Sequence, residues 1–181
     1  MKYSKTITLK NGKSCLLRNG ERADAAQVCD NFNLTHGQTD FLLSYPDENC
    51  FTVEQEEEFL TKKSSSEKEI LICAVVDGKI VGTAGINAVG EQEKLKHRAE
   101  FGISIEKDYW GMGIGRAMTK ACIECAKEAG YSQLELGVIA DNMSAVSLYK
   151  SVGFVEYGRN PREFCSRYTG WQEVILMRLE L

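Results

Sequence analysis

Three glycines at alternate positions could form a binding site for an anion. They are Gly111, Gly113 and Gly115, and they come directly before Arg116 and a run with helical periodicity. The first turn of a helix presents unpaired backbone N–H groups and the positive end of the helix dipole, which suits a phosphate. Glycines also let a phosphate approach the backbone closely. The pattern alone is compatible with a phosphate site and equally with glycines that only allow close packing where a helix begins.

Two familiar phosphate loops do not fit these residues. A Walker A loop ends in Gly-Lys-Ser or Gly-Lys-Thr, and neither follows these glycines. A dinucleotide fingerprint needs glycine where the chain has Arg116, and a sharp turn where residues 106–110 intervene. A dinucleotide-dependent oxidoreductase is therefore disfavoured, but it stays open as a rival from another enzyme class.

The composition indicates a soluble globular protein. Hydrophobic residues make up 43% of the 181 residues and charged residues 27%, and no apolar run approaches the ~18 residues that span a bilayer. The net charge of -4 and the pI near 5.4 argue against nucleic acid as a partner. The first ten residues lack the apolar block of a secretory signal, so we expect a cytoplasmic protein with no membrane partner.

The cysteines do not predict a metal site. Cys122 and Cys125 are three residues apart in an apolar helical stripe, and no second pair or nearby histidine completes a zinc site. We expect buried, reduced thiols and no metal. The seven cysteines are scattered along the chain at Cys15, Cys29, Cys50, Cys73, Cys122, Cys125 and Cys165.

The remaining patterns predict one α/β domain over residues 1–181 with a mixed sheet. Hairpin turns are expected at Asn11-Gly12 and Asp77-Gly78, and a turn into the last strand at residues 170–174. The expected strands are Thr6–Leu9, Cys15–Arg18, Ile70–Val76, Ile80–Val89, Ala99–Ile105, Leu134–Ala140, Phe154–Tyr157 and Val174–Leu181. The expected helices are Glu21–Phe32, Val53–Lys63, one from Ile114 to a C-cap at Gly130, and one from Asp141 or Asn142 to Gly153.

Smaller features complete this reading of the chain. Gly37, Pro46 and Asp47 should break the chain between the first two helices, and the acidic residues of 54–58 should form a solvated helix face. The strand from Ala99, the helix from Ile114 and the next strand form a βαβ unit, which implies parallel neighbouring strands.

Two segments resemble the GCN5-related N-acetyltransferase (GNAT) superfamily. Its signature is Q/R-x-x-G-x-G/A opening a helix, with N-x-x-A-x-x-L-Y-x-x-x-G-F downstream. The first element matches at Gly113 and Gly115, with Trp110 in place of the leading Gln or Arg. The second element is complete in Asn142, Ala145, Leu148, Tyr149, Gly153 and Phe154. The resemblance implies a single-domain mixed sheet whose central parallel strands splay apart, flanked by helices.

The resemblance also implies acetyl-CoA as cosubstrate. Its pyrophosphate would lie on the backbone from Gly111 to Arg116, and its pantetheine arm would run beside the strand that ends at Ile105. The cofactor-binding residues implied in this way are Ile103, Ser104, Ile105, Gly111, Met112, Gly113, Ile114, Gly115, Arg116, Asn142 and Tyr149.

Acetyl transfer to an amine requires a base for the amine, polarisation of the thioester carbonyl and an acid for the leaving thiolate. Tyr149 is the expected general acid, because a phenol is protonated at neutral pH. Glu100 is the first candidate base, with His97 and Glu135 as alternatives, and Gly137 stands where some family members carry a glutamate. A mechanism without a dedicated base stays open.

The acceptor is expected to be a primary amine, either an amino acid, a small amine or a protein N-terminus. Residues 36–51 and 158–171 are expected to build its surface, with Glu173 before the last strand, and the acidic residues Asp47 and Glu48 could favour a cationic amine. The expected reaction is direct attack in a ternary complex. A non-catalytic acyl-CoA sensor is the alternative, and a homodimer is left open.

Overall fold

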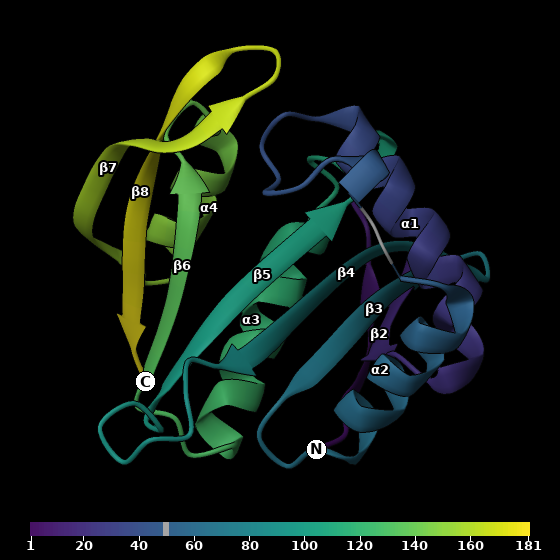
Figure 1. Cartoon of the computed structure of the whole chain (residues 1–181). Coiled ribbons are helices and arrows are strands. Elements are labelled where there is room, and N and C mark those ends of the chain that lie inside the picture. The colour runs from purple at the N-terminus through teal and green to yellow at the C-terminus, as the bar shows by residue number, and fades with distance from the viewer. Residues whose placement is uncertain (49–50) are drawn as a thin grey trace.

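The computed structural model describes residues 1–48 and 51–181, and Figure 1 shows a mixed β-sheet with helices on both of its faces. Within these residues the sheet has eight strands in the order β1-β2-β3-β4-β5-β6-β8-β7. The strands are β1 (Ser4–Thr8), β2 (Ser14–Asn19), β3 (Ile70–Val76), β4 (Lys79–Ala88), β5 (Arg98–Ile105), β6 (Gln133–Ile139), β7 (Val155–Ser166) and β8 (Gly170–Glu180).

Four α-helices cover the described part of this sheet. The helices are α1 (Ala25–Gln38), α2 (Val53–Ser65), α3 (Ile114–Glu128) and α4 (Met143–Ser151), with short 3₁₀ turns at Arg22–Asp24, Pro46–Glu48 and Lys107–Tyr109. Helices α1 and α2 lie on one face of β2 to β4, α3 lies on the opposite face, and α4 lies behind β6 and β8 (Figure 1). No helix in the described residues is long and apolar enough to cross a membrane.

Apolar periodicity determines which side of each helix meets the sheet. The stripe of α3 that contains Met118, Cys122 and Cys125 is buried against β3, β4 and β5 in the main core. A smaller cluster joins Val28 of α1 and Leu60 of α2 to Ile80 of β4. The two layers hold β5 in place between them, and β5 is the strand on which the site is built.

The two parallel strands diverge from one closed end. Strands β5 and β6 pair only from Arg98–Glu100 to Gln133–Glu135, and beyond these residues β5 pairs only with β4 and β6 only with β8. At the closed end the Arg98 guanidinium donates two hydrogen bonds to the Glu135 carboxylate, one of them from Nη2 to Oε2 at 2.7 Å. Figure 1 shows the two strands opening into a V from this point. The expected mixed sheet with a splayed central pair and flanking helices is thus confirmed.

Both predicted hairpins are present, because their turn residues adopt the left-handed conformation that the turns require. Gly12 has φ +84°, and Asp77 and Gly78 have φ +51° and +80°. The predicted helix from Ile114 is also present, with Gly130 at φ +78° just after its last turn.

The prediction for the last two strands is wrong in its extent. Strand β7 runs to Ser166 rather than ending at Tyr157, and β8 begins at Gly170. The pairing shifts between Glu156 and Gly158 and again between Asn160 and Phe164, so bulges at Tyr157 and at residues 161–163 let the strand continue past Pro161. The turn lies at residues 167–169, and Glu173 lies within β8 rather than before it.

The first helix is also longer than predicted. Helix α1 begins at Ala25 and continues through Gly37 to Gln38, although Gly37 was expected to break the chain. The helix persists because its last turns are held by other contacts: the Thr35 hydroxyl bonds to the Asn31 carbonyl at 2.8 Å, and the rings of Phe32 and His36 stack at 3.7 Å.

Two surface predictions need correction. Glu56 of the acidic run is 7% exposed and packs inward from α2, and burial raises the pKa of its carboxyl. Among the thiols, Cys165 is exposed and Cys29 is half-buried, whereas the other described ones are buried. Cys50 lies outside the described residues.

Removing the charge of Glu135 should destabilise the closed end. Glu135→Gln leaves the guanidinium of Arg98 without a counter-charge, and we expect a loss of about 1–2 kcal/mol in the free energy of unfolding. Arg98 lowers the folded-state pKa of Glu135 below its ordinary value of 4.5. The stabilisation is therefore present above that value and is lost as the pH falls through the folded-state pKa.

Urea unfolding of wild type and Glu135→Gln at pH 7 and at acid pH measures both effects. Glu180→Gln is the matched control, because the side chain of Glu180 is 79% exposed and 3.6 Å from Arg178. A stability difference that is absent at pH 7, or that grows in acid, would contradict the assigned role of the pair.

Candidate functional site

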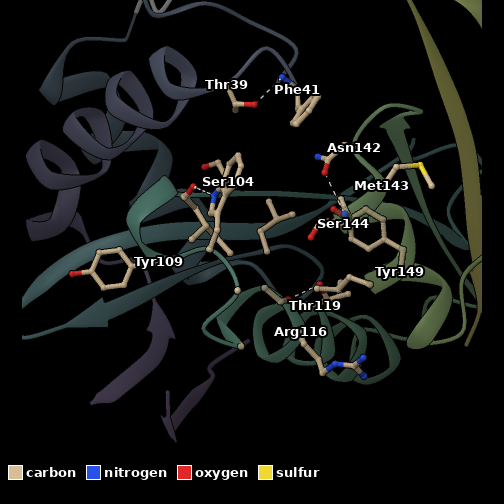
Figure 2. A pocket seen from close by; sticks show the side chains of 18 of the residues that line it. Thr39, Phe41, Ser104, Tyr109, Arg116, Thr119, Asn142, Met143, Ser144 and Tyr149 are labelled. Carbon is tan, nitrogen blue, oxygen red and sulfur yellow. Dashed lines mark hydrogen bonds between the residues drawn. The ribbon is translucent and has the colours of Figure 1, made fainter. Parts of the chain in front are cut away.

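The open end of the V holds a cavity of about 580 Å³. Five segments line it: the turn between β1 and β2 at Lys10, the end of β5, the glycine loop with the start of α3, the start of α4, and Thr39, Phe41 and Leu42 after α1. Figure 2 shows Thr39 and Phe41 on one side of this space, with Ser104, Asn142 and Ser144 across from them. The cavity therefore lies between the two halves of the sheet, and its walls come from both.

The glycine loop adopts a conformation that other residues disfavour. Gly111 has φ +74° and Gly113, the N-cap of α3, has φ +100°. No atom lies within 4 Å of the position a Cβ would take at either glycine, so the space beside the loop is open. A Cβ at Gly115 would instead meet Leu148 Cδ1 at 3.4 Å, which makes Gly115 a packing glycine between α3 and α4.

The start of α3 offers donors to this open space. The first intrahelical bond in this turn runs from Ala117 N to Gly113 O at 3.2 Å, so the N–H groups of residues 114–116 precede the hydrogen-bond ladder. The helix has 15 residues, and its dipole adds positive potential at the same place. The arrangement can bind an anion such as a phosphate.

Two residues of the predicted set do not line the cavity with their side chains. Ile114 is fully buried in the main core, and Met112 packs against the turn between β1 and β2. There Met112 O accepts a hydrogen bond from Lys10 N at 3.3 Å, and its sulfur accepts one from Asn11 Nδ2 at 3.5 Å. Both residues could contribute to a ligand only through their backbone.

The end of β5 provides a free backbone edge. Residues 103–105 line the cavity and pair only with β4, so their groups on the side of β6 have no strand partner. One of these groups is used locally, because Trp110 Nε1 donates to Ile105 O at 2.7 Å. The rest of the edge can pair with an extended ligand as another strand would.

Tyr149 of α4 lines the same cavity from the other half of the sheet. Its ring is 7% exposed and packs edge-on against Phe101, with the ring centres 6.0 Å apart. Burial raises the pKa of the phenol to about 12. The hydroxyl makes no hydrogen bond to another described residue, and it stays protonated throughout the physiological pH range.

Asn142 is both the N-cap of α4 and a cavity residue. Its Oδ1 accepts a hydrogen bond from Ala145 N at 3.2 Å, as the dashed line in Figure 2 shows, which confirms the predicted cap. Its amide nitrogen bonds to no described residue. Arg116 also lines the cavity, but its Nη2 donates to Ser151 Oγ at 2.7 Å, and Figure 2 shows it pointing away from Tyr149.

The three candidate bases differ in their surroundings. Glu100 is exposed, lies at the last parallel register position and makes no ion pair within the described residues, but it does not line the cavity. Glu135 is buried rather than at the surface, and Arg98 neutralises it. His97 is exposed in the loop before β5, as expected.

A network of hydrogen bonds connects the loop after α1 to the hairpin of β7 and β8. Asp40 Oδ2 accepts from Ser166 Oγ at 2.6 Å, from Thr169 Oγ1 at 2.9 Å and from Gln172 Nε2 at 3.0 Å. The Tyr45 hydroxyl accepts from Arg167 N at 2.9 Å. We call these contacts the Asp40 latch. They hold Phe41 and Leu42 over the cavity and bridge the open end of the V.

Sequence reasoning placed the acceptor surface in these two segments but missed their connection. It also missed Lys10, Thr119 and Asp141, which line the cavity as well. No local pattern marks Lys10, because its place depends on the packing of the first hairpin against the glycine loop. Among residues 1–48 and 51–181, no three His, Cys, Asp or Glu side chains are grouped so that they could hold a metal ion.

Known proteins share the fold and part of the sequence of this chain. Residues 36–154 match the model of the acetyltransferase (GNAT) family. A crystal structure of an acetyltransferase of this family from Streptococcus pneumoniae is 33% identical, with a TM-score of 0.88 over 92% of this chain and 99% of that one. The splayed sheet and these matches thus define the class of protein as an acetyltransferase. The chain belongs to the acetyltransferase (GNAT) family, which overturns the oxidoreductase reading.

Curated relatives match over part of their length. The chain is 32% identical to the L-amino acid N-acetyltransferase AaaT of Escherichia coli over 48% of this chain and 52% of that protein. It is 33% identical to the ribosomal protein bS18-alanine N-acetyltransferase of the same species over 58% of this chain and 67% of that one. For human N-acetyltransferase 8B the identity is 31% over 45% of this chain and 37% of the relative. The chain thus spans about a third to two thirds of these proteins.

Breaking the Asp40 latch should release the loop after α1. We expect Asp40→Ala to raise amide hydrogen exchange in residues 41–45 and 167–172 by about tenfold or more. The carboxylate loses the three hydrogen bonds given above and a fourth, from the Tyr45 hydroxyl to Asp40 Oδ1 at 3.3 Å. Hydrogen exchange followed by mass spectrometry measures this directly.

Asp47→Ala is the control for the latch, because it removes only the exposed pair of Asp47 with Arg167. It should change exchange in the same segments by less than about twofold. Equal exchange in both variants would show that Asp40 does not hold the loop.

Proposed function

We propose that this chain is an N-acetyltransferase that moves the acetyl group of acetyl-CoA to a primary amine by direct attack in a ternary complex. The main support for the proposal is that the glycine loop, the free edge of β5 and the protonated Tyr149 all line one cavity. Family membership supports acetyl transfer as the reaction. A structural neighbour from Salmonella typhimurium, 17% identical with a TM-score of 0.81, was solved with its cofactor acetyl-CoA.

The residues present fit acetyl-CoA along its length. The diphosphate would lie on the N–H groups at the start of α3, where the open space beside Gly111 and Gly113 leaves room for it. The pantetheine arm would pair with the free edge at residues 103–105, and the amide nitrogen of Asn142 is available to the same ligand. The thioester would then lie near Tyr149, which lines the same cavity.

The transfer forms a bond between the amine nitrogen and the thioester carbon and breaks the bond from that carbon to sulfur. The amine loses one proton and the sulfur gains one. Tyr149 supplies the proton to the thiolate, since its phenol is protonated and has no competing hydrogen bond to another described residue. Backbone N–H groups at the splay are available to the carbonyl oxygen as negative charge develops on it.

Glu100 is the base that we propose, acting through water. It lies on β5 four residues before Ser104, which lines the cavity, and it has no ion-pair partner among the described residues. Glu135 is unsuited, because its carboxylate is held by Arg98. That Glu100 does not line the cavity is the observation that favours the second candidate function, a non-catalytic acyl-CoA sensor.

The acceptor would bind under the Asp40 latch, between the loop after α1 and the hairpin of β7 and β8. Two of the curated relatives named above are named for acting on L-amino acids and on the alanine of a ribosomal protein. We therefore propose an amino acid, a small amine or a protein N-terminus as the acceptor.

Gly113→Asp should abolish detectable binding of acetyl-CoA. The substitution places a carboxylate where the diphosphate would lie and forces a side chain onto a residue with φ +100°. Gly78→Asp is the matched control, because Gly78 has φ +80°, is equally free of neighbours within 4 Å and lies in the turn between β3 and β4, outside the cavity. Calorimetry on both folded variants provides the test, and wild-type affinity in Gly113→Asp would remove the phosphate assignment.

Tyr149→Phe should lower turnover by about 100-fold and leave the affinity for acetyl-CoA within about twofold, because only proton donation is lost. With a pKa of about 12, Tyr149 should cause no fall in turnover below about pH 11. Thiol release measures turnover, and calorimetry measures affinity.

Tyr131→Phe removes another buried phenol, outside the cavity, and serves as the control. Full activity in Tyr149→Phe would assign the proton to water or another group.

A further inference from the structure

The turn between β1 and β2 brings a cation to the glycine loop. Lys10 N donates to Met112 O at 3.3 Å, and Asn11 Nδ2 donates to the sulfur of the same residue, so the turn is fixed against the loop through its backbone and through a neighbouring side chain. Lys10 itself is exposed and lines the cavity. Its ammonium is therefore free to move while its backbone stays beside the predicted phosphate seat.

Few charged residues line the cavity. Among the residues that line it, Lys10 and Arg116 are the cations and Asp141 is the acid. The guanidinium of Arg116 donates a hydrogen bond to the hydroxyl of Ser151 of α4. The Lys10 ammonium has no hydrogen-bond or ion-pair partner in the described residues, whereas Lys13 in the same turn pairs with Asp77 at 2.7 Å. Lys10 is thus a cation at the cavity rim that no protein carboxylate neutralises.

We propose that Lys10 binds the 3′-phosphate on the ribose of coenzyme A, which makes it a specificity-determining residue for this cosubstrate. This inference rests on the proposed function. The backbone N–H groups at the start of α3 would donate hydrogen bonds to the diphosphate, so the diphosphate does not need a side-chain cation. The 3′-phosphate is a second anionic group outside that seat, and a flexible, exposed lysine beside the loop matches it as a point charge.

The test is a comparison of acetyl-CoA with acetyl-dephospho-CoA, which lacks only the 3′-phosphate. Calorimetric dissociation constants are measured for wild type, Lys10→Ala and Lys13→Ala. We expect wild type to prefer acetyl-CoA by about three- to tenfold. Lys10→Ala should lose this preference by weakening acetyl-CoA alone, and Lys13→Ala should keep it. The preference of wild type should also shrink as the salt concentration rises.

These binding measurements distinguish a failure of the Lys10 assignment from a failure of acetyl-CoA binding as a whole. Equal weakening of both ligands in Lys10→Ala, or an unchanged preference, would overturn the assignment of Lys10 while leaving acetyl-CoA as the ligand. Restoration of the preference in Lys10→Arg would support it, because charge rather than shape is then what matters. If wild type binds neither ligand, the proposed function fails first, and the inference fails with it.

Discussion

The separation of β5 from β6 is the constraint on which the rest of the structure depends. Pairing stops after Glu100 and Glu135, and the ion pair of Arg98 with Glu135 closes the sheet just at that end. Because the strands separate beyond it, the end of β5 keeps a free backbone edge, and α3 and α4 approach one cavity from different halves of the sheet. The opposite end of the V is bridged by side chains, chiefly through Asp40, so the cavity lies between a fixed closed end and a latched open end.

The chemistry of the cavity follows from how each wall is made. The start of α3 contributes backbone N–H groups and a helix dipole, and its glycines leave the space beside them empty. Helix α4 contributes Tyr149, whose burial against Phe101 keeps the phenol protonated. A protonated phenol and the start of a helix that can bind an anion line one cavity, and both would suit the long, phosphate-bearing thioester that we propose as the ligand. Apolar Phe41 and Leu42 line the cavity next to the polar Asp40 latch, and this mixed surface would suit the amine that we propose as the acceptor if it carries some apolar surface.

Local signals were enough to predict much of the fold and part of the site. The Asp77-Gly78 turn, the glycine after α3 and the Asn142 cap each encode their geometry in one or two residues, and all are present. Predictions were wrong where tertiary contacts override local preferences. Bulges allow β7 to continue past Pro161. Helix α1 continues through Gly37 because the side chains of its last turns make stabilising contacts. Lys10 and the Asp40 latch could not be predicted, since each joins segments about 100 residues or more apart in the chain.

Whether the cavity binds acetyl-CoA and supports transfer is tested by titrating the protein with acetyl-CoA in a calorimeter, and then following free thiol release with a panel of amino acids, polyamines, aminoglycosides and short peptides. We expect saturable binding of one acetyl-CoA per chain and thiol release that depends on at least one amine. Binding without release on any amine would contradict the catalytic claim and favour an acyl-CoA sensor. The absence of binding would contradict the assignment of the glycine loop and the cavity as an acetyl-CoA site.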